Sequence, residues 1–175
     1  MNQVTMKFIL LTIAAFHLAP SYGQNFVTKE GEYMDTSSAV NAPCGVNVAR
    51  YVFGDTGPIF YYSTGCKYPK SSTSLLKEAK AFMARKNNSY SGSGYITFRF
   101  TIDCEGHMLK KVRVFQTDES YTNTRFDKTL VNELFDYVKT LDKWKKAGAK
   151  TGPAFNYMAF ITFKIRNGKV INIIP

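Results

Sequence analysis

The chain has 175 residues, of which 15% are aromatic, and it carries a net charge of +10 with two histidines and three cysteines. This length suits one domain and is enough to bury a proper core. No internal repeat, low-complexity tract or proline-rich spacer is present, and the absence of C-x-x-C and H-x-x-x-H spacings argues against a metal site. We also expect no cofactor.

Residues 1–23 predict an export signal. Lys7 supplies the positive flank, an apolar run of twelve residues covers 8–19, and Ser21–Gly23 offers small residues around a cleavage point. As a helix the run would rise about 18 Å, well short of a bilayer core of about 30 Å. A cleaved signal is therefore favoured over a membrane anchor. We expect an exported protein, in the periplasm or outside the cell, with no stable membrane span after cleavage.

Residues 24–67 are predicted to form an N-terminal extension. Two short β-like runs, Val48–Phe53 and Ile59–Tyr62, flank a turn rich in glycine and proline and indicate a hairpin. In an oxidising compartment a disulfide between Cys44 and Cys66 is favoured, because both lie in this turn-rich stretch. Three cysteines allow three single pairings, so a bridge from Cys104 to one of the other two stays open.

The first helix is predicted after Tyr68-Pro69, where any residue of Ser71–Ser74 could cap it. Gly94–Asp103 follows with strict alternation, which is typical of a strand that has one buried face. The residues expected on its buried face are Ile96, Phe98, Phe100 and Ile102. A turn at Asp103–Gly106 leads to a second, more basic strand at His107–Phe115.

From Phe126 to Trp144 the apolar spacing becomes helical and predicts a long amphipathic helix. A glycine- and proline-containing segment at 148–153 ends it, and Asn156–Ile165 alternates again as a strand. Asn167-Gly168 is a strong hairpin signal, so Val170–Ile174 would fold back as one more strand. The element order predicts an α+β fold: a small antiparallel sheet of three or four strands with two helices on one face.

One turn gathers residues that enzymes use, namely Asp103, Cys104, Glu105 and His107. A nucleophilic cysteine needs a base within reach and a positioned oxyanion hole. An exposed turn offers no cleft to exclude water, so ordinary turn chemistry is favoured. The sequence contains no nucleophile elbow, zinc-binding helix or phosphate-cradling glycine loop. We expect no enzymatic activity.

The sequence resembles the C-terminal domain of TonB, in the single-domain form that bacteria of the Bacteroidetes type export. The resemblance covers roughly residues 68–165 and rests on the order of its parts. Those parts are a Tyr-Pro pair before a helix, a strand opened by Gly94 and turned at Gly106, Phe126-Asp127 before a second helix, Trp144, and a closing strand that ends Phe163-Lys164-Ile165.

This resemblance implies a periplasmic binding module at residues 68–175, not a catalyst. Such a module binds an extended peptide of an outer-membrane transporter or other envelope protein as an added strand, and so serves transport across the outer membrane. Strand addition takes affinity from main-chain hydrogen bonds and selectivity from alternate side chains. By correspondence the binding edge consists of Asn156, Tyr157, Met158, Ala159, Phe160, Ile161, Thr162 and Phe163.

Two features depart from the family. The chain has no uncleaved anchor with a proline-rich spacer, and Val170–Ile174 would cover the binding edge if it paired with Asn156–Ile165. The alternative function is therefore an envelope protein that has lost the peptide edge and binds anionic polymer or lipid through its basic surface. The two dense basic runs, 110–113 and 143–146, are more typical of solvated faces. Nucleic acid is a poor candidate partner for an exported protein.

Overall fold

The computed structural model describes residues 32–33, 59–148 and 154–175, all of which belong to one compact unit, Gly31–Pro175. The predicted export signal, the Val48–Phe53 strand and Cys44 lie outside the described residues. Within the described parts of the chain, no helix is long and apolar enough to span a bilayer.

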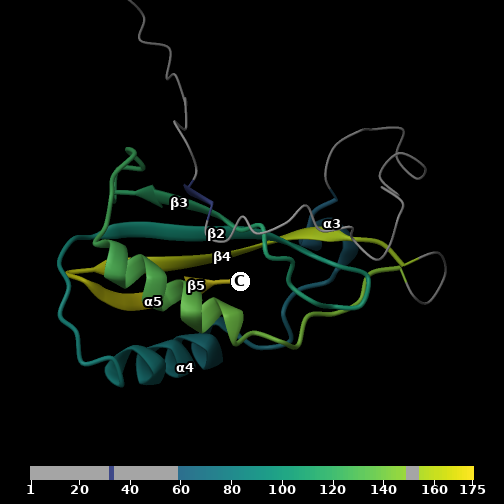
Figure 1. Ribbon diagram of the computed structural model, residues 1–175, viewed down its shortest axis with the longest axis horizontal. Helices are drawn as coiled ribbons and strands as arrows, with labels where there is room; N and C mark the ends of the chain where they lie inside the picture. The colour runs from purple at the N-terminus through teal and green to yellow at the C-terminus, as the bar shows by residue number, and fades with distance from the viewer. Residues whose placement is uncertain (1–31, 34–58, 149–153) are drawn as a thin grey trace, which may run out of the picture. The chain divides into compact units, whose positions relative to one another are not determined.

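The described residues form an antiparallel sheet with the strand order β1-β3-β2-β4-β5 (Figure 1). The four long strands are β2 (Gly94–Ile102), β3 (Arg113–Thr117), β4 (Tyr157–Arg166) and β5 (Lys169–Ile174). Strand β1 is only two residues, Glu32–Tyr33, and pairs with the start of β3. Together with the helices this confirms the predicted α+β fold class.

Helices α4 (Ser72–Ala84) and α5 (Lys128–Lys139) pack on the sheet, and a short α3 (Tyr61–Thr64) precedes them. The predicted serine cap of α4 is Ser71, whose hydroxyl accepts a hydrogen bond from the Ser74 amide at 3.2 Å. Figure 1 shows both long helices beside β4 and β5.

Helix α5 is shorter than the predicted Phe126–Trp144. It starts late because the Asp127 carboxylate accepts from the amides of Thr129 and Leu130 and so caps the first turn. It ends at Lys139, and the hydroxyl of the next residue, Thr140, donates to the Tyr137 carbonyl at 2.7 Å. The second strand also starts later than predicted, at Arg113, because the chain leaves the sheet after a single bridge at Met108.

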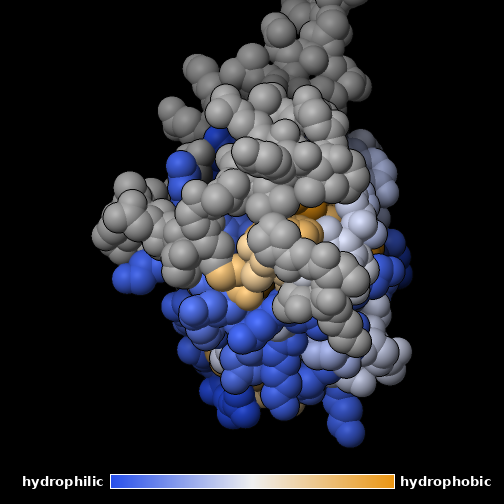
Figure 2. Space-filling view, turned by 90° about the vertical axis from the view of Figure 1, so that its right-hand side faces the viewer, coloured by the Kyte–Doolittle hydropathy of each residue, from blue (hydrophilic) through white to orange (hydrophobic). Residues whose placement is uncertain are grey.

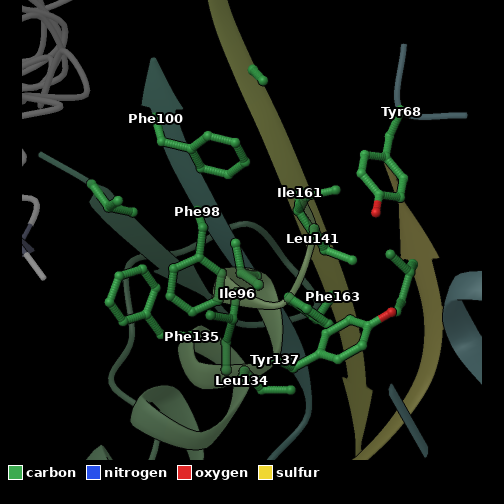
Figure 3. Packing of buried hydrophobic residues seen from close by; sticks show 14 of the residues in the cluster. Tyr68, Ile96, Phe98, Phe100, Leu134, Phe135, Tyr137, Leu141, Ile161 and Phe163 are labelled. Atoms are coloured by element: carbon green, nitrogen blue, oxygen red, sulfur yellow. The ribbon is translucent and has the colours of Figure 1, made fainter. Parts of the chain in front are cut away.

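The core lies between the helices and one face of the sheet, as the strand alternation predicts. The four predicted inward residues of β2 are at most 2% exposed, whereas their neighbours along the strand are half-buried. Phe98 contacts the rings of Phe135 and Phe163, with centroid distances of 5.7 and 5.9 Å (Figure 3). Tyr137 joins the two helices because its hydroxyl donates to the Leu75 carbonyl at 3.0 Å.

Candidate functional site

Seven of the eight residues predicted to bind a peptide lie in β4, and Asn156 immediately precedes it. Tyr157, Ala159 and Ile161 point into the core, and Met158 and Phe160 are half-buried on the opposite face of the sheet. This division between the two faces is the predicted one, because successive side chains of a strand point to opposite faces.

Strand β4 is not an edge strand, so the prediction of an open edge at Asn156–Phe163 is wrong. It pairs with β2 along its length, from Tyr157 to Ile165, and Thr162–Arg166 pair with β5 on the other side. The cause is the turn at Asn167 and Gly168, where φ angles of 49° and 70° give the left-handed conformation of a tight hairpin.

Strand β5 is held at both ends. At the turn the Gly168 amide donates to the Gly92 carbonyl at 2.8 Å. At the other end the Tyr61 hydroxyl donates to the Pro175 carbonyl at 3.1 Å. Burial, followed by the neighbouring Tyr62, raises the pKa of Tyr61 and keeps this donor protonated. Between these ends, Val170 and Ile173 are buried in the core.

On the side away from β2, the first half of β4 is paired much more weakly than the second half, and we call the segments paired on this side the covers of β4. The Met158 amide donates to the Ile59 carbonyl at 2.7 Å, and Phe60 forms an isolated parallel bridge with Met158. Backbone groups of alternate strand residues point to the same side, so those of Phe160 face this edge as well. Phe160 lies between the Phe60 bridge and the first β5 pair at Thr162, and within the described chain it pairs with neither cover.

Four side chains gather at this gap and form what we call the aromatic cluster: Phe60, Tyr61, Tyr62 and Phe160. The ring of Phe60 stacks on Phe160 at 5.8 Å and on Tyr62 at 5.3 Å. Tyr62 is 59% exposed, and Ile174 at the end of β5 is 51% exposed. The run Phe60-Tyr61-Tyr62 was a signal in the sequence, but the strand prediction for this segment gave it no role in binding.

Figure 2 views the molecule from the end at which Figure 1 labels α3. It shows an apolar area, in orange, within a largely hydrophilic surface.

The two outer edges of the sheet are less suited to strand addition. The start of β3 pairs with β1, and its end is covered because the Thr124 amide donates to the Gln116 carbonyl at 3.1 Å. Strand β5 has a register shift against β4, and the Ile173 amide donates to the Asn172 side chain at 2.9 Å. Irregular pairing and locally satisfied amides protect edges from further pairing.

The predicted disulfide between Cys44 and Cys66 is wrong, because Cys66 is a buried free thiol. Its Sγ lies 3.7 Å from the Thr64 carbonyl oxygen and 3.9 Å from that of Lys146, so the side chain faces the protein interior. Cys104 is the cysteine that is disulfide-bonded. It therefore offers no free thiolate as a nucleophile in the β2–β3 turn.

That turn brings together the other polar residues of the sequence motif. Asp103 is only 4% exposed, and its Oδ1 accepts hydrogen bonds from the amides of Glu105 and His107 at 2.9 and 2.8 Å. Its Oδ2 lies 3.5 Å from His107 Nδ1, and Glu105 Oε2 lies 3.6 Å from the same nitrogen. The turn thus holds two carboxylates against one imidazole.

The basic run at 143–146 contains one core residue and three exposed ones. Trp144 is buried against Tyr68 and Phe100, with ring centroids 4.8 and 5.3 Å away. Lys143, Lys145 and Lys146 are exposed and form no ion pair within the described chain. The backbone of this run is held against β4, because the Tyr157 hydroxyl donates to the Lys145 carbonyl at 2.7 Å.

Comparisons with protein-family models, with curated proteins and with solved structures gave no match to this chain.

Proposed function

We propose that this chain is a non-enzymatic binding module of the cell envelope, which holds an extended peptide by strand addition to the first half of β4. The peptide would belong to an outer-membrane transporter or another envelope protein. The observation that supports this proposal is the stretch of β4 around Phe160, which has no partner on this side among the described residues and lies beside the backbone hydrogen bond of Met158 to Ile59.

The two covers of β4 differ in how readily a peptide could replace them. Removing β5 would expose Val170 and Ile173 and break contacts at both of its ends. Removing the Ile59–Thr64 segment would expose less apolar surface, because α3 has no buried residue and Ile59 and Tyr61 are only partly buried against the core. Segments with few buried contacts open most easily. A peptide that displaced this segment could pair with the backbone of Met158 and Phe160.

Phe160, the member of the aromatic cluster that belongs to β4, would supply side-chain contacts to such a peptide. Aromatic residues dominate the binding energy of protein interfaces, since they bury a large area at a low entropy cost. An incoming strand has side chains on both faces of the sheet, and those beside Phe160 would meet its aromatic ring, on which Phe60 stacks in the free chain. We therefore expect bound peptides to alternate apolar and polar residues.

Selection of peptides from a random display library against the full chain tests this proposal. We expect extended peptides with alternating apolar residues. Phe160→Pro should weaken their binding roughly tenfold or more, because it removes one backbone hydrogen bond and also the aromatic ring that would contact the peptide. It should leave the fold intact, because the Phe160 amide points away from β2. Phe60→Ala should strengthen binding, since the cover competes with the peptide for β4.

Tyr121→Ala is a suitable control, because Tyr121 is 68% exposed but stacks on Tyr95, away from the aromatic cluster. This variant should bind the selected peptides as the wild type does. The proposal is wrong if no peptide is enriched, or if Phe160→Pro and the wild type bind the same peptides equally well.

A second candidate is binding of anionic polymer or lipid, favoured by the exposed lysines around Trp144. Lys67 lies near Lys146, because the thiol of the preceding Cys66 contacts the Lys146 carbonyl. Binding of vesicles containing anionic lipid should then weaken steeply between low and high salt, whereas strand addition should depend little on salt. Retention of vesicles that is equal at both salt concentrations would exclude this candidate.

A further inference from the structure

We propose that the β2–β3 turn binds a divalent transition-metal ion of the zinc type through Asp103, Glu105 and His107. One donor atom from each side chain lies within 4.8 Å of the other two. His107 Nδ1 is 3.5 Å from Asp103 Oδ2 and 3.6 Å from Glu105 Oε2. Two ligands of a tetrahedral zinc ion, each about 2.0–2.2 Å from the metal, are roughly 3.3–3.6 Å apart. These two donor pairs therefore already have the spacing of a metal site.

The buried carboxylate of Asp103 is directed at this position. Two backbone amides occupy its Oδ1, which leaves Oδ2 turned toward His107. A metal ligand is commonly oriented by such hydrogen bonds to its other atoms. Since Asp103 is almost fully buried, it cannot turn into solvent when the metal is absent. The exposed side chains of Glu105 and His107 would adjust around it to complete the set.

The rest of the turn is rigid, so metal binding would order little additional chain. The Cys104 amide donates to Asn156 Oδ1 at 3.1 Å. Gly106 has a φ of 90° and lies so close to the 144–146 loop that an added Cβ would stand 2.8 Å from the Trp144 carbonyl oxygen. A preformed site loses less entropy when it binds its ligand.

The donor set also indicates which metals would bind. Two carboxylates and a neutral imidazole balance the charge of a divalent cation, and an imidazole favours zinc and its transition-metal neighbours over magnesium and calcium. Three protein ligands leave the fourth position of a tetrahedral ion to water. Cys104 does not take part, because it is disulfide-bonded. The site is separate from the β4 peptide edge, so either proposal can fail alone.

The test is a titration of the metal-free, oxidised full chain with zinc, followed by calorimetry and by NMR of the histidine side chains. The chain has only two histidines, His17 and His107, so their signals are easily separated. We expect one zinc ion per chain, with the shift of a metal-bound Nδ1 at His107, and no binding of magnesium or calcium at the same concentration. His107→Ala and Glu105→Gln should each weaken zinc binding roughly tenfold or more.

Glu119→Gln is the matched control, since Glu119 is an exposed glutamate in the next turn and faces Arg166 at 4.0 Å. This variant should bind zinc like the wild type. Both variants of the turn change exposed side chains, so urea unfolding should show that they remain folded. The proposal is overturned if zinc shifts only His17, if His107→Ala keeps the wild-type affinity, or if no zinc binds. The turn would then hold His107 beside the two carboxylates without a metal ion.

Discussion

At the scale of single residues, Glu133 is a buried carboxylate that fixes α5 to the linker before β2. It is 7% exposed and accepts hydrogen bonds from the Asn88 side chain and the Tyr90 hydroxyl, each at 2.7 Å. Glu133→Ala leaves two donors without their partner, and should lower the free energy of unfolding by about 1–3 kcal/mol in urea titrations.

Glu78→Ala is the control for Glu133→Ala. Glu78 pairs with Lys70 at 2.7 Å, but both side chains are substantially exposed to solvent. Exposed pairs contribute about 0–1 kcal/mol, so this variant should lose less stability. Equal losses in the two variants would contradict a structural role for the buried carboxylate.

Two buried tyrosines should make the stability of the fold fall at high pH. Burial raises the pKa of Tyr137 and of Tyr157 above the usual value of about 10. The unfolded chain therefore loses these protons first, so their stabilising contribution is complete below pH 10 and declines as the pH rises further. Tyr137→Phe should make this decline shallower when urea unfolding is measured from pH 9 to 11.

The same variant also removes the hydrogen bond to Leu75, which should lower stability by about 1 kcal/mol at neutral pH. Tyr62→Phe changes an exposed tyrosine and should leave the stability at neutral pH unchanged. If Tyr137→Phe and the wild type showed the same slope above pH 10, the ionisation of Tyr137 would not be the cause.

At the scale of elements, the faces of the strands and the β4–β5 hairpin could be predicted from sequence, but the pairing of Ile59 and Phe60 with β4 could not. A period of two assigns each residue to a face from its neighbours alone, which is why Ile96 and Phe98 were placed correctly in the core. Strand neighbours depend instead on contacts between distant segments. The bridge of Phe60 to Met158 joins residues nearly a hundred positions apart, and no local pattern announces it.

The β4–β5 hairpin illustrates this dependence on a distant contact. The Asn167-Gly168 pair predicts a turn, but the turn also rests on the linker at Tyr90–Gly92, so that an added Cβ at Gly168 would collide with the Tyr90 carbonyl oxygen. Gly168→Ala should therefore push the hairpin off the linker. We expect a loss of unfolding free energy and faster hydrogen exchange in β5.

Gly65 provides the matched control for Gly168. Both residues have a left-handed φ, 65° and 70°, but an added Cβ at Gly65 would meet no atom within 4 Å. Gly65→Ala should lower the free energy of unfolding by only about 1 kcal/mol, the cost of a left-handed backbone for alanine. It should leave hydrogen exchange in β5 unchanged. If the two variants lost equal stability, contact with the linker would not be what holds the hairpin.

At the scale of the whole molecule, closeness in sequence was a poor guide to the environment of the cysteines. Cys44 and Cys66 are close in sequence, but the path of the chain places Cys66 in the core, where its Sγ faces the Lys146 carbonyl. With Cys66 free and Cys104 disulfide-bonded, Cys44 is the remaining cysteine. We therefore expect a disulfide between Cys44 and Cys104, which would join the N-terminal extension to the β2–β3 turn.

Peptide mapping without reduction should find the peptides of Cys44 and Cys104 linked, and Cys66 alkylated only after unfolding. A loop of about 60 residues corresponds to roughly 4 kcal/mol in the chain-entropy model, so reduction should lower the free energy of unfolding by about 2–4 kcal/mol. Cys66→Ala should keep the disulfide between Cys44 and Cys104 and the loss of stability on reduction, because the Cys66 thiol is not part of this disulfide. A link from Cys104 to Cys66, or three reactive thiols in the native protein, would contradict this pairing.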